Sequence, residues 1–387
     1  KSLLKSFETE EQVKFLVKLK DQVDTEKVAA LAQEKAKAKN LSAFQTKHVT
    51  RSTVITELKA NANTTQKRIL DFAEKEKAKG NVSEIESFYI VNAVAIKGTK
   101  EVMEKIASFE EVEKVLLDEK RKVIQTEIDV SQQIENAIQS IEWNIDRVKA
   151  PDAWALGYDG SGVTVAIIDT GVQWDHPTLK DKYLGYNAET GEVNHEIAFF
   201  DAVNGQTAAY DDHGHGTHVT GTIVGSSPDG SNQIGVAPGA KFIAAKAIAS
   251  DGYGYNSDFI SAGQWVMDQG ADVVNNSWGG GPGIDEFFRP MVQSWRSVGI
   301  LPVFAAGNTD LFTPQEPGTV ASPANYPESF AVGATDSNDE LANFSLLGPS
   351  PYGELKPEVS APGVSIRSSY PNNSFAGASG TSMAAPH

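Results

Sequence analysis

Gly380-Thr381-Ser382-Met383-Ala384-Ala385-Pro386 sets a serine among small residues late in this sequence of 387 residues. The alanines that follow Ser382 favour a helix, so the hydroxyl can stand at a helix N-terminus, where backbone N–H groups stabilise developing negative charge. Two earlier residues, Asp169 and His215, complete a set of Asp, His and Ser. These three side chains are the parts of an activated serine nucleophile.

Asp169 follows a run of apolar and β-branched residues over 163–168 and precedes Thr170-Gly171. This pattern places a carboxylate at the end of a strand, where the chain enters a loop. An ordinary turn aspartate fits the same pattern. The catalytic interpretation therefore depends on the companions of Asp169.

His215 is flanked by Gly214 and Gly216, which let the backbone turn sharply and expose the imidazole at a helix start. A neutral imidazole near pH 7 can take the serine proton and return it to a leaving amine. A zinc site is the alternative, because residues 211–218 hold three His and two Asp. Their spacing matches no zinc pattern, so we favour the base and expect His218 to be a packed helix residue.

Asn308 follows an apolar segment that ends in Ala305-Ala306-Gly307. Its side-chain amide can donate a hydrogen bond to the oxyanion of a tetrahedral intermediate. A plain Gly-Asn turn is the alternative interpretation. Asn308 is thus the fourth candidate site residue.

From Trp143 onward, short apolar segments alternate with helical segments and Gly-rich turns. This pattern predicts an α/β fold with a parallel sheet and helices on both faces. The strand candidates are residues 163–168, 240–246, 271–276 and 300–306. Asp169 and Asn308 come just after two of these candidates, where functional residues of parallel sheets gather.

The preceding part of the chain predicts a small α+β domain. Strands are expected over 13–19, 88–96 and 112–117, and helices over 24–39, 52–79 and 100–109. Residues 120–142 are polar and carry no strong strand signal, which is typical of an exposed linker.

Charge divides the sequence at the same place. Residues 1–140 carry 24 Lys and Arg against 23 Asp and Glu, whereas residues 141–387 carry 10 against 28. The acidic second part repels phosphates and anionic lipid, so we expect neither nucleic acid nor a membrane as partner. Polypeptide is the better prediction for a substrate. Cysteine is absent, which excludes disulfides and thiolate-bound metal.

Three segments resemble, in order, the Asp, His and Ser motifs of the subtilisin-like serine proteases, or subtilases. They are residues 165–172, 215–222 and 380–386. The order of Asp, His and Ser is that of subtilisin and differs from chymotrypsin and the α/β-hydrolases. Residues 143–387 are similar to this family as a whole, which implies a subtilisin-like sheet.

The resemblance implies a serine endopeptidase that works through an acyl-enzyme and requires no cofactor for its chemistry. The same resemblance implies that Asp169 orients His215, that His215 is the general base and acid, and that Ser382 is the nucleophile. Asn308 and the Ser382 backbone N–H form the oxyanion hole. Ser277-Trp278-Gly279 resembles the substrate-binding segment of the family, whose backbone pairs with the substrate as an added strand. Trp278 then reshapes an apolar subsite, although simple packing is the alternative.

The first part of the chain resembles the subtilase propeptide, a ferredoxin-like inhibitor and folding aid that is later cut off. We therefore expect a propeptide or inhibitor-like domain over 1–120, a processing linker over 121–142 and the catalytic domain over 143–387. Secretion to the extracellular space follows from the same resemblance. The alternative is an inactive or truncated protease fold that binds and inhibits a protease through its N-terminal domain.

Two features depart from the family pattern. Thr178 stands where many subtilases carry an aspartate that ligates calcium, so that site is in doubt; structural calcium elsewhere is left unassigned, although carboxylates in loops suit this ion. Family members also continue past the Ser motif, so we expect a catalytic domain that is cut short at His387.

Overall fold

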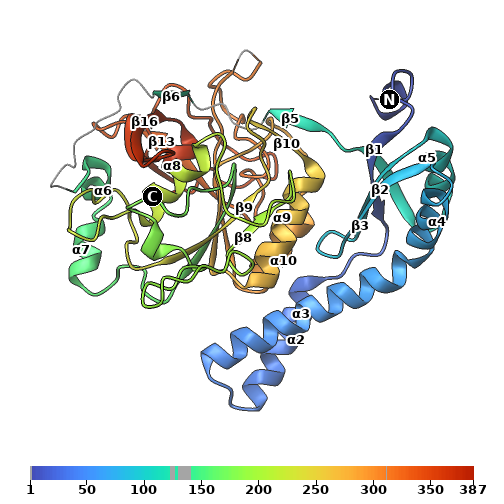
Figure 1. Ribbon diagram of the computed structural model, residues 1–387, viewed down its shortest axis with the longest axis horizontal. Helices are drawn as coiled ribbons and strands as arrows, with labels where there is room; N and C mark the ends of the chain where they lie inside the picture. The colour runs from blue at the N-terminus through green and yellow to red at the C-terminus, as the bar shows by residue number, and fades with distance from the viewer. Residues whose placement is uncertain (1, 123–126, 130–140, 311) are drawn as a thin grey trace. The chain divides into compact units, whose positions relative to one another are not determined.

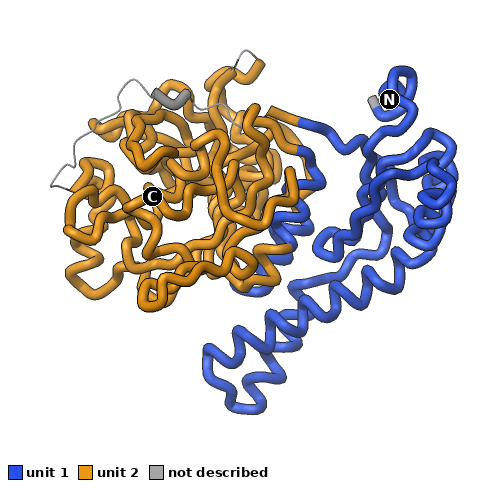
Figure 2. Tube along the Cα trace, viewed as in Figure 1, with its two compact units in different colours: residues 1–120, 255–264, 290–299 blue, residues 121–254, 265–289, 300–387 orange. Residues whose placement is uncertain are grey.

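The computed structural model describes residues 2–122, 127–129, 141–310 and 312–387, with the backbone alone described for Ser2 and for 127–129. The chain forms two compact units (Figure 2). Unit 1 consists of residues 1–120, 255–264 and 290–299, and unit 2 of residues 121–254, 265–289 and 300–387. The expected division into propeptide, linker and catalytic domain stays a prediction, and most of the linker lies outside the described residues.

Unit 1 is built around a four-stranded antiparallel sheet in the order β2-β3-β1-β4. Its strands are β1 (Val13–Leu19), β2 (Val82–Phe88), β3 (Ala93–Gly98) and β4 (Val112–Leu117). Helices follow β1 and β3, so the unit has the β-α-β-β-α-β order of ferredoxin-like folds. The predicted small α+β domain is confirmed.

The predicted single strand over 88–96 is wrong. The apolar run contains the turn of a hairpin, in which β2 ends at Phe88 and β3 begins at Ala93. Asn92 adopts a φ of 40° in this turn, a conformation that asparagine tolerates better than other side chains. The turn residues Tyr89–Val91 are buried, and their apolar character therefore mimics a strand in the sequence.

Five helices accompany this sheet: α1 (Ser2–Ser6), α2 (Thr25–Ala38), α3 (Ala43–Thr65), α4 (Lys67–Lys77) and α5 (Lys100–Ala107). The helix predicted over 52–79 is in fact two. Ser42 caps the start of α3 and forms a reciprocal capping box with Gln45. The helix is interrupted at Gln66, which separates α3 from α4. The Gln66 side chain is buried and donates to the carbonyl oxygen of Phe88 and to Asn92 Oδ1, which ties the break to the hairpin.

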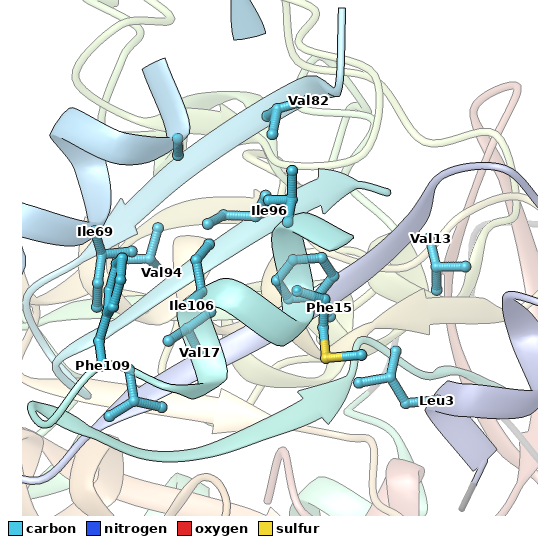
Figure 3. Packing of buried hydrophobic residues seen from close by; sticks show 14 of the residues in the cluster. Leu3, Val13, Phe15, Val17, Ile69, Val82, Val94, Ile96, Ile106 and Phe109 are labelled. Carbon is cyan, nitrogen blue, oxygen red and sulfur yellow. The ribbon is translucent and has the colours of Figure 1, made fainter. Parts of the chain in front are cut away.

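The core of unit 1 lies between the sheet and the faces of α4 and α5 (Figure 3). Phe15, Ile96 and Ile106 are fully buried in it. Phe109 meets Phe72 edge to face, with ring centroids 5.6 Å apart. Helix α5 is amphipathic, because Val102, Met103 and Ile106 share its buried face.

Unit 2 contains a seven-stranded sheet in the order β14-β13-β12-β11-β7-β9-β8, and every adjacent pair is parallel. The strands are β7 (Thr164–Asp169), β8 (Phe199–Asp201), β9 (Lys241–Lys246), β11 (Val273–Asn276), β12 (Leu301–Ala305), β13 (Phe330–Thr335) and β14 (Val359–Pro362). The predicted parallel α/β fold is confirmed. All four strand candidates are strands of this sheet.

The remaining strands form two small sheets. One is antiparallel, in the order β15 (Ile366–Tyr370), β16 (Ser374–Ser379), β6 (Glu127–Asp129). The other pairs β10 (Tyr253–Tyr255) with β5 (Lys120–Lys122). Residues 120–142, which carry no strong strand signal in the sequence, thus include the short strands β5 and β6, because three residues are too few for a periodic signal.

The other helices are α6 (Trp143–Arg147), α7 (Ala150–Ala155), α8 (His215–Val224), α9 (Asn256–Gln269), α10 (Arg289–Ser297) and α11 (Thr381–Ala384), with a 3-10 turn at Lys180–Lys182. Helix α8 is buried along its whole length and packs against β7 and β9 (Figure 1). Helix α11 packs against β12, β13 and α8. The first turns of α8 and α11 carry His215 and Ser382.

Candidate active site

Asp169 and His215 form a buried hydrogen-bonded pair. Nδ1 of His215 lies 2.8 Å from Oδ1 of Asp169 and 3.0 Å from Oδ2. Because the carboxylate accepts, Nδ1 carries the proton and Nε2 is left as the basic nitrogen. Nε2 is buried and has no hydrogen-bond partner among the described residues. The backbone N–H of Thr170 also donates to Asp169 Oδ1, over 2.7 Å, which holds the carboxylate in place.

Asp211 supplies the cap that the start of α8 lacks. Gly214 is the N-cap residue of this helix and has no side chain to accept from its free N–H groups. Instead, Asp211 Oδ2 accepts from the backbone N–H of Thr217 over 2.9 Å, and Oδ1 accepts from that of Gly214 over 2.8 Å. The helix turn that carries His215 is thereby held by a fixed carboxylate.

Thr170 connects this cap to the strand of Asp169. Its hydroxyl donates to Asp211 Oδ1 over 2.9 Å and accepts from the backbone N–H of Gly216 over 2.9 Å. A Cβ atom at Gly216 would lie 2.1 Å from the carbonyl oxygen of Gly171, so only glycine fits there. The loop after Asp169 and the helix turn of His215 are therefore in backbone contact.

The charge of Asp211 is stabilised by these contacts. Burial alone raises the pKa of this carboxyl group, but hydrogen bonds from Thr217, Gly214 and His213 outweigh burial and lower the pKa below its ordinary value. Asp211 is thus ionised whenever the fold is intact near neutral pH.

Ser382 lies in the first turn of α11 and is 6% exposed. Its Oγ donates to the carbonyl oxygen of Ser277 over 2.9 Å. The described hydrogen bonds do not join Ser382 to His215, although α11 and α8 pack against each other. The hydroxyl must therefore release the carbonyl oxygen of Ser277 before His215 Nε2 can take its proton.

The side chain of Asn308 is fixed against α11. Its Oδ1 accepts from the backbone N–H of Thr381 over 2.9 Å and from the Thr381 hydroxyl over 2.8 Å. A backbone N–H can only donate, so this contact orients the amide and leaves Nδ2 available as a donor. The Thr381 hydroxyl also accepts from the backbone N–H of Gly307 over 3.1 Å. Asn308 therefore adjoins the residue before Ser382 with its donor group free of α11.

The segment Ser277-Trp278-Gly279 follows β11 directly. Trp278 is 3% exposed, and its ring lies edge to face with Phe288 and Phe304, with centroids 5.5 and 5.6 Å away. The Trp278 side chain is thus part of the apolar core. A role for this segment in substrate binding stays a prediction.

Comparisons with known proteins agree with this geometry. The family model described as the subtilase family matches residues 160–387. This chain belongs to the subtilase family. Over 403 aligned residues it is 53% identical to bacillopeptidase F of Bacillus subtilis (strain 168), an alignment that covers 100% of this chain and 28% of that protein. It is 38% identical to subtilisin DY of Bacillus licheniformis, across 64% of this chain and 82% of the relative.

An alkaline protease of Shouchella clausii is 36% identical across 67% of this chain and 60% of the relative. The chain thus spans little more than a quarter of bacillopeptidase F, whereas it covers most of the length of the two other relatives. The family prediction made from the three motifs is confirmed.

Several residues that shape the site of this subtilase escaped the sequence analysis. Thr170 and Thr381 each adjoin a predicted site residue, and Asp211 lies four residues before His215; their hydroxyl or carboxylate groups are the signal that could have pointed to them. Lys246 is fully buried and pairs in register with Asp169 on the neighbouring strand. Its Nζ donates to the carbonyl oxygens of Thr170 and Ile248 and to Asp212 Oδ1, over 2.8, 2.9 and 2.6 Å.

The zinc interpretation of residues 211–218 finds no support in the described part of the chain. No group of three or more His, Asp or Glu that could hold a metal ion occurs among the described residues. Nε2 of His218 lies 3.1 Å from the carbonyl oxygens of Ile366 and Ala376, and burial lowers the pKa of His218 to about 4. His218 is the packed helix residue that was predicted.

Thr178 is buried at the position where many subtilases have a calcium-binding aspartate. Its hydroxyl contacts Nδ1 of His176 over 2.8 Å and the hydroxyl of Ser369 over 2.7 Å. The Thr178 hydroxyl thus finds its hydrogen-bond partners within the protein. Structural calcium elsewhere in this subtilase stays a prediction.

Proposed function

We propose that this subtilase is a serine endopeptidase that hydrolyses peptide bonds through an acyl-enzyme at Ser382. The buried pair of His215 and Asp169 is the observation that carries the proposal, because it leaves the basic Nε2 without a partner. A buried, unpartnered nitrogen is costly unless the site uses it. General-base catalysis is such a use.

In the first half-reaction, His215 Nε2 removes the proton of Ser382 as Oγ attacks the carbonyl carbon of the scissile bond. Negative charge then moves to the carbonyl oxygen, where Asn308 Nδ2 and the Ser382 backbone N–H donate to it. Asp169 stabilises the imidazolium, which gives its proton to the leaving amine as the C–N bond breaks. The acyl group remains on Ser382.

In the second half-reaction, His215 removes a proton from water, and the hydroxide attacks the acyl carbon. The C–O bond to Ser382 breaks, and Oγ recovers its proton from His215. No step requires a metal or an organic cofactor. The cycle returns the site to its starting state with a free carboxylate and a free amine as products.

We also propose that residues 1–120 form a propeptide that inhibits this site and is removed by cleavage within 121–142. Support comes from the ferredoxin-like strand order of unit 1 and from the alignment with bacillopeptidase F, which covers the whole chain. The product would be a secreted, extracellular enzyme that acts on polypeptides. No helix in the described residues is long and apolar enough to cross a membrane.

The test follows the intact mass of the chain and of its Ser382→Ala variant over time, together with a fluorophosphonate that labels activated serines. We expect cleavage between residues 120 and 142 and a label on Ser382, with both absent in the variant. A chain that stays intact and unlabelled would contradict the proposal. If that chain nonetheless inhibited a subtilisin, the inhibitory function would be the better account.

A further inference from the structure

An ion pair joins Arg121 and Asp285, two residues of unit 2 that lie far apart in the sequence. Nη1 of Arg121 lies 3.2 Å from Oδ2 of Asp285. Arg121 is the middle residue of β5, which is added as a strand to β10. The chain thus places one of its own extended segments, with a basic side chain, on an acidic residue of unit 2.

Asp285 is held in a fixed position. Its Oδ1 accepts from the backbone N–H of Phe287 over 3.1 Å. Its carbonyl oxygen accepts from the hydroxyls of Ser322, over 3.2 Å, and of Tyr326. These bonds fix both ends of the residue and leave Oδ2 directed at Arg121. Asp285 is therefore held by bonds that do not involve Arg121, and a residue held in this way lowers the entropic cost of binding a cation.

A segment of three residues leads from Ser277, which contacts the nucleophile, to Gly280, which contacts Arg121. Ser277 accepts the hydrogen bond of Ser382, and Gly280 follows three residues later. A Cβ atom at Gly280 would lie 3.6 Å from Nη1 of Arg121, so the guanidinium sits against this glycine. Three residues span at most about 10 Å. An extended peptide with its scissile bond at Ser382 would therefore bring its third to fifth residue to Asp285.

The direction of that peptide follows from the chain itself. Arg121 precedes the proposed cleavage region, so its place corresponds to the N-terminal side of a scissile bond.

The two neighbouring carboxylates are already paired, because Glu286 and Glu328 both bind Arg289. Asp285 is the acidic group of this surface that a substrate cation would meet.

We propose that Asp285 forms a subsite for an arginine or lysine side chain of the substrate, about three to five residues before the scissile bond. Arg121 occupies this subsite in the uncleaved chain. This inference rests on the proposed peptidase function. The side chains of Arg121 and Asp285 are 35% and 37% exposed, so the preference is modest: ion pairs of this kind change an equilibrium by up to about fivefold.

The experiment measures kcat/KM of the processed enzyme on a peptide in which arginine, neutral citrulline or glutamate stands at each upstream position in turn. At one position, arginine should exceed citrulline by about three- to fivefold. Asp285→Asn should remove this ratio, and Asp285→Lys should favour glutamate at the same position. Added salt should reduce the ratio in the wild type, because it screens exposed charges.

Glu189→Gln is the matched control, since it removes one exposed carboxylate of unit 2 and should keep the arginine preference. Full fluorophosphonate labelling of Ser382 in Asp285→Asn shows that the variant has folded. Equal rates for arginine and citrulline at every position, or a preference that survives Asp285→Asn, would overturn the subsite alone. Absence of both hydrolysis and fluorophosphonate labelling in the wild type would overturn the proposed function, and the subsite with it.

Discussion

Ser382 and Ser277 exchange hydrogen bonds: Oγ of Ser382 donates to the carbonyl oxygen of Ser277 over 2.9 Å, and Oγ of Ser277 donates to the carbonyl oxygen of Ser382 over 2.9 Å. This pair joins the end of β11 to the first turn of α11. Asn275 Nδ2 also donates to Ser277 Oγ over 2.9 Å. The nucleophile is thereby attached to the segment that we expect to pair with substrate.

Replacing Ser277 by alanine should destabilise the chain. The substitution leaves the buried carbonyl oxygen of Ser382 and the amide of Asn275 without this partner, which costs about 1–3 kcal/mol of the free energy of unfolding. Urea denaturation in the Ser382→Ala background, where self-digestion is prevented, measures this loss. Ser337→Ala, at an exposed position, should change the free energy by less than about 0.5 kcal/mol. Equal effects of the two substitutions would show that the exchange contributes nothing.

Asn308→Ala should lower kcat by about 100- to 1,000-fold with little change in KM, a magnitude that comes from subtilisin, a member of this family. The reason is that Nδ2 would donate only to the charge that develops in the transition state. Active-site titration should still count a full complement of Ser382. Asn338→Ala, in an exposed turn, is the control. Wild-type turnover of Asn308→Ala would reduce Asn308 to a turn residue that supports Thr381.

Asp169→Asn should lower kcat by about 10,000-fold while the geometry is kept. Asparagine presents either an amide group or an oxygen to Nδ1 of His215 and no longer stabilises the imidazolium. The pH profile of kcat/KM separates this from misfolding, because hydroxide can partly replace the missing base at high pH. A variant with more than a tenth of wild-type turnover would exclude the proposed role of Asp169.

The sequence predicted the residues at strand ends and helix starts, because local patterns govern those positions. Asp169 was found since it ends a buried apolar strand, and Ser382 since small residues surround it. Lys246 was missed, and Asp211 was considered only as a candidate metal ligand, because bonds that hold them in place join residues distant along the chain: Asp211 bonds to Thr170, and Lys246 to Asp212. The hairpin turn at Asn92 was missed for a related reason, since burial of the turn made it apolar. Neither distant pairing nor burial of a turn has a periodic signature.

Asp211→Asn should make the chain less stable and flatten its response to acid. Both oxygens of the wild-type carboxylate accept hydrogen bonds from N–H and O–H groups. The side-chain amide of asparagine would instead turn its own N–H groups toward some of these donors, so those hydrogen bonds would be lost. Because the pKa of Asp211 is lowered in the folded state, its contribution to stability is present at neutral pH and is lost as pH falls below the unfolded carboxyl value near about 4. We expect a loss of about 1–3 kcal/mol at pH 7 that shrinks towards pH 3, measured by denaturation in the Ser382→Ala background. A loss that is constant over this range would contradict the assignment.

Unit 1 contains a pair of buried acids whose pKa shifts are opposite to that of Asp211. Asp118 and Asp258 are 3% and 7% exposed. Asp118 accepts from the N–H and hydroxyl of Ser257 over 3.1 and 2.6 Å, and Lys14 lies 3.5 Å from its Oδ2. The pKa of Asp258 is raised to about 7, mainly by burial; the charge of Lys14 lowers it in part, and the charges of Asp118 and Glu86 contribute to the rise. One lysine therefore faces three carboxylates in this part of unit 1.

Unit 1 should for this reason lose stability as pH rises. The folded pKa of Asp258 lies above the unfolded value near about 4, so its contribution is complete below pH 4 and disappears as pH approaches 7. With a difference of about three pKa units, the change is on the order of 2–4 kcal/mol. Amide hydrogen exchange of β1, β4 and the first turns of α9 at pH 5 and 8, corrected for intrinsic rates, measures it. Asp258→Asn should remove most of the dependence, whereas Asp71→Asn, on the exposed face of α4, should keep it. Identical protection at both pH values would mean that Asp258 ionises without disturbing unit 1.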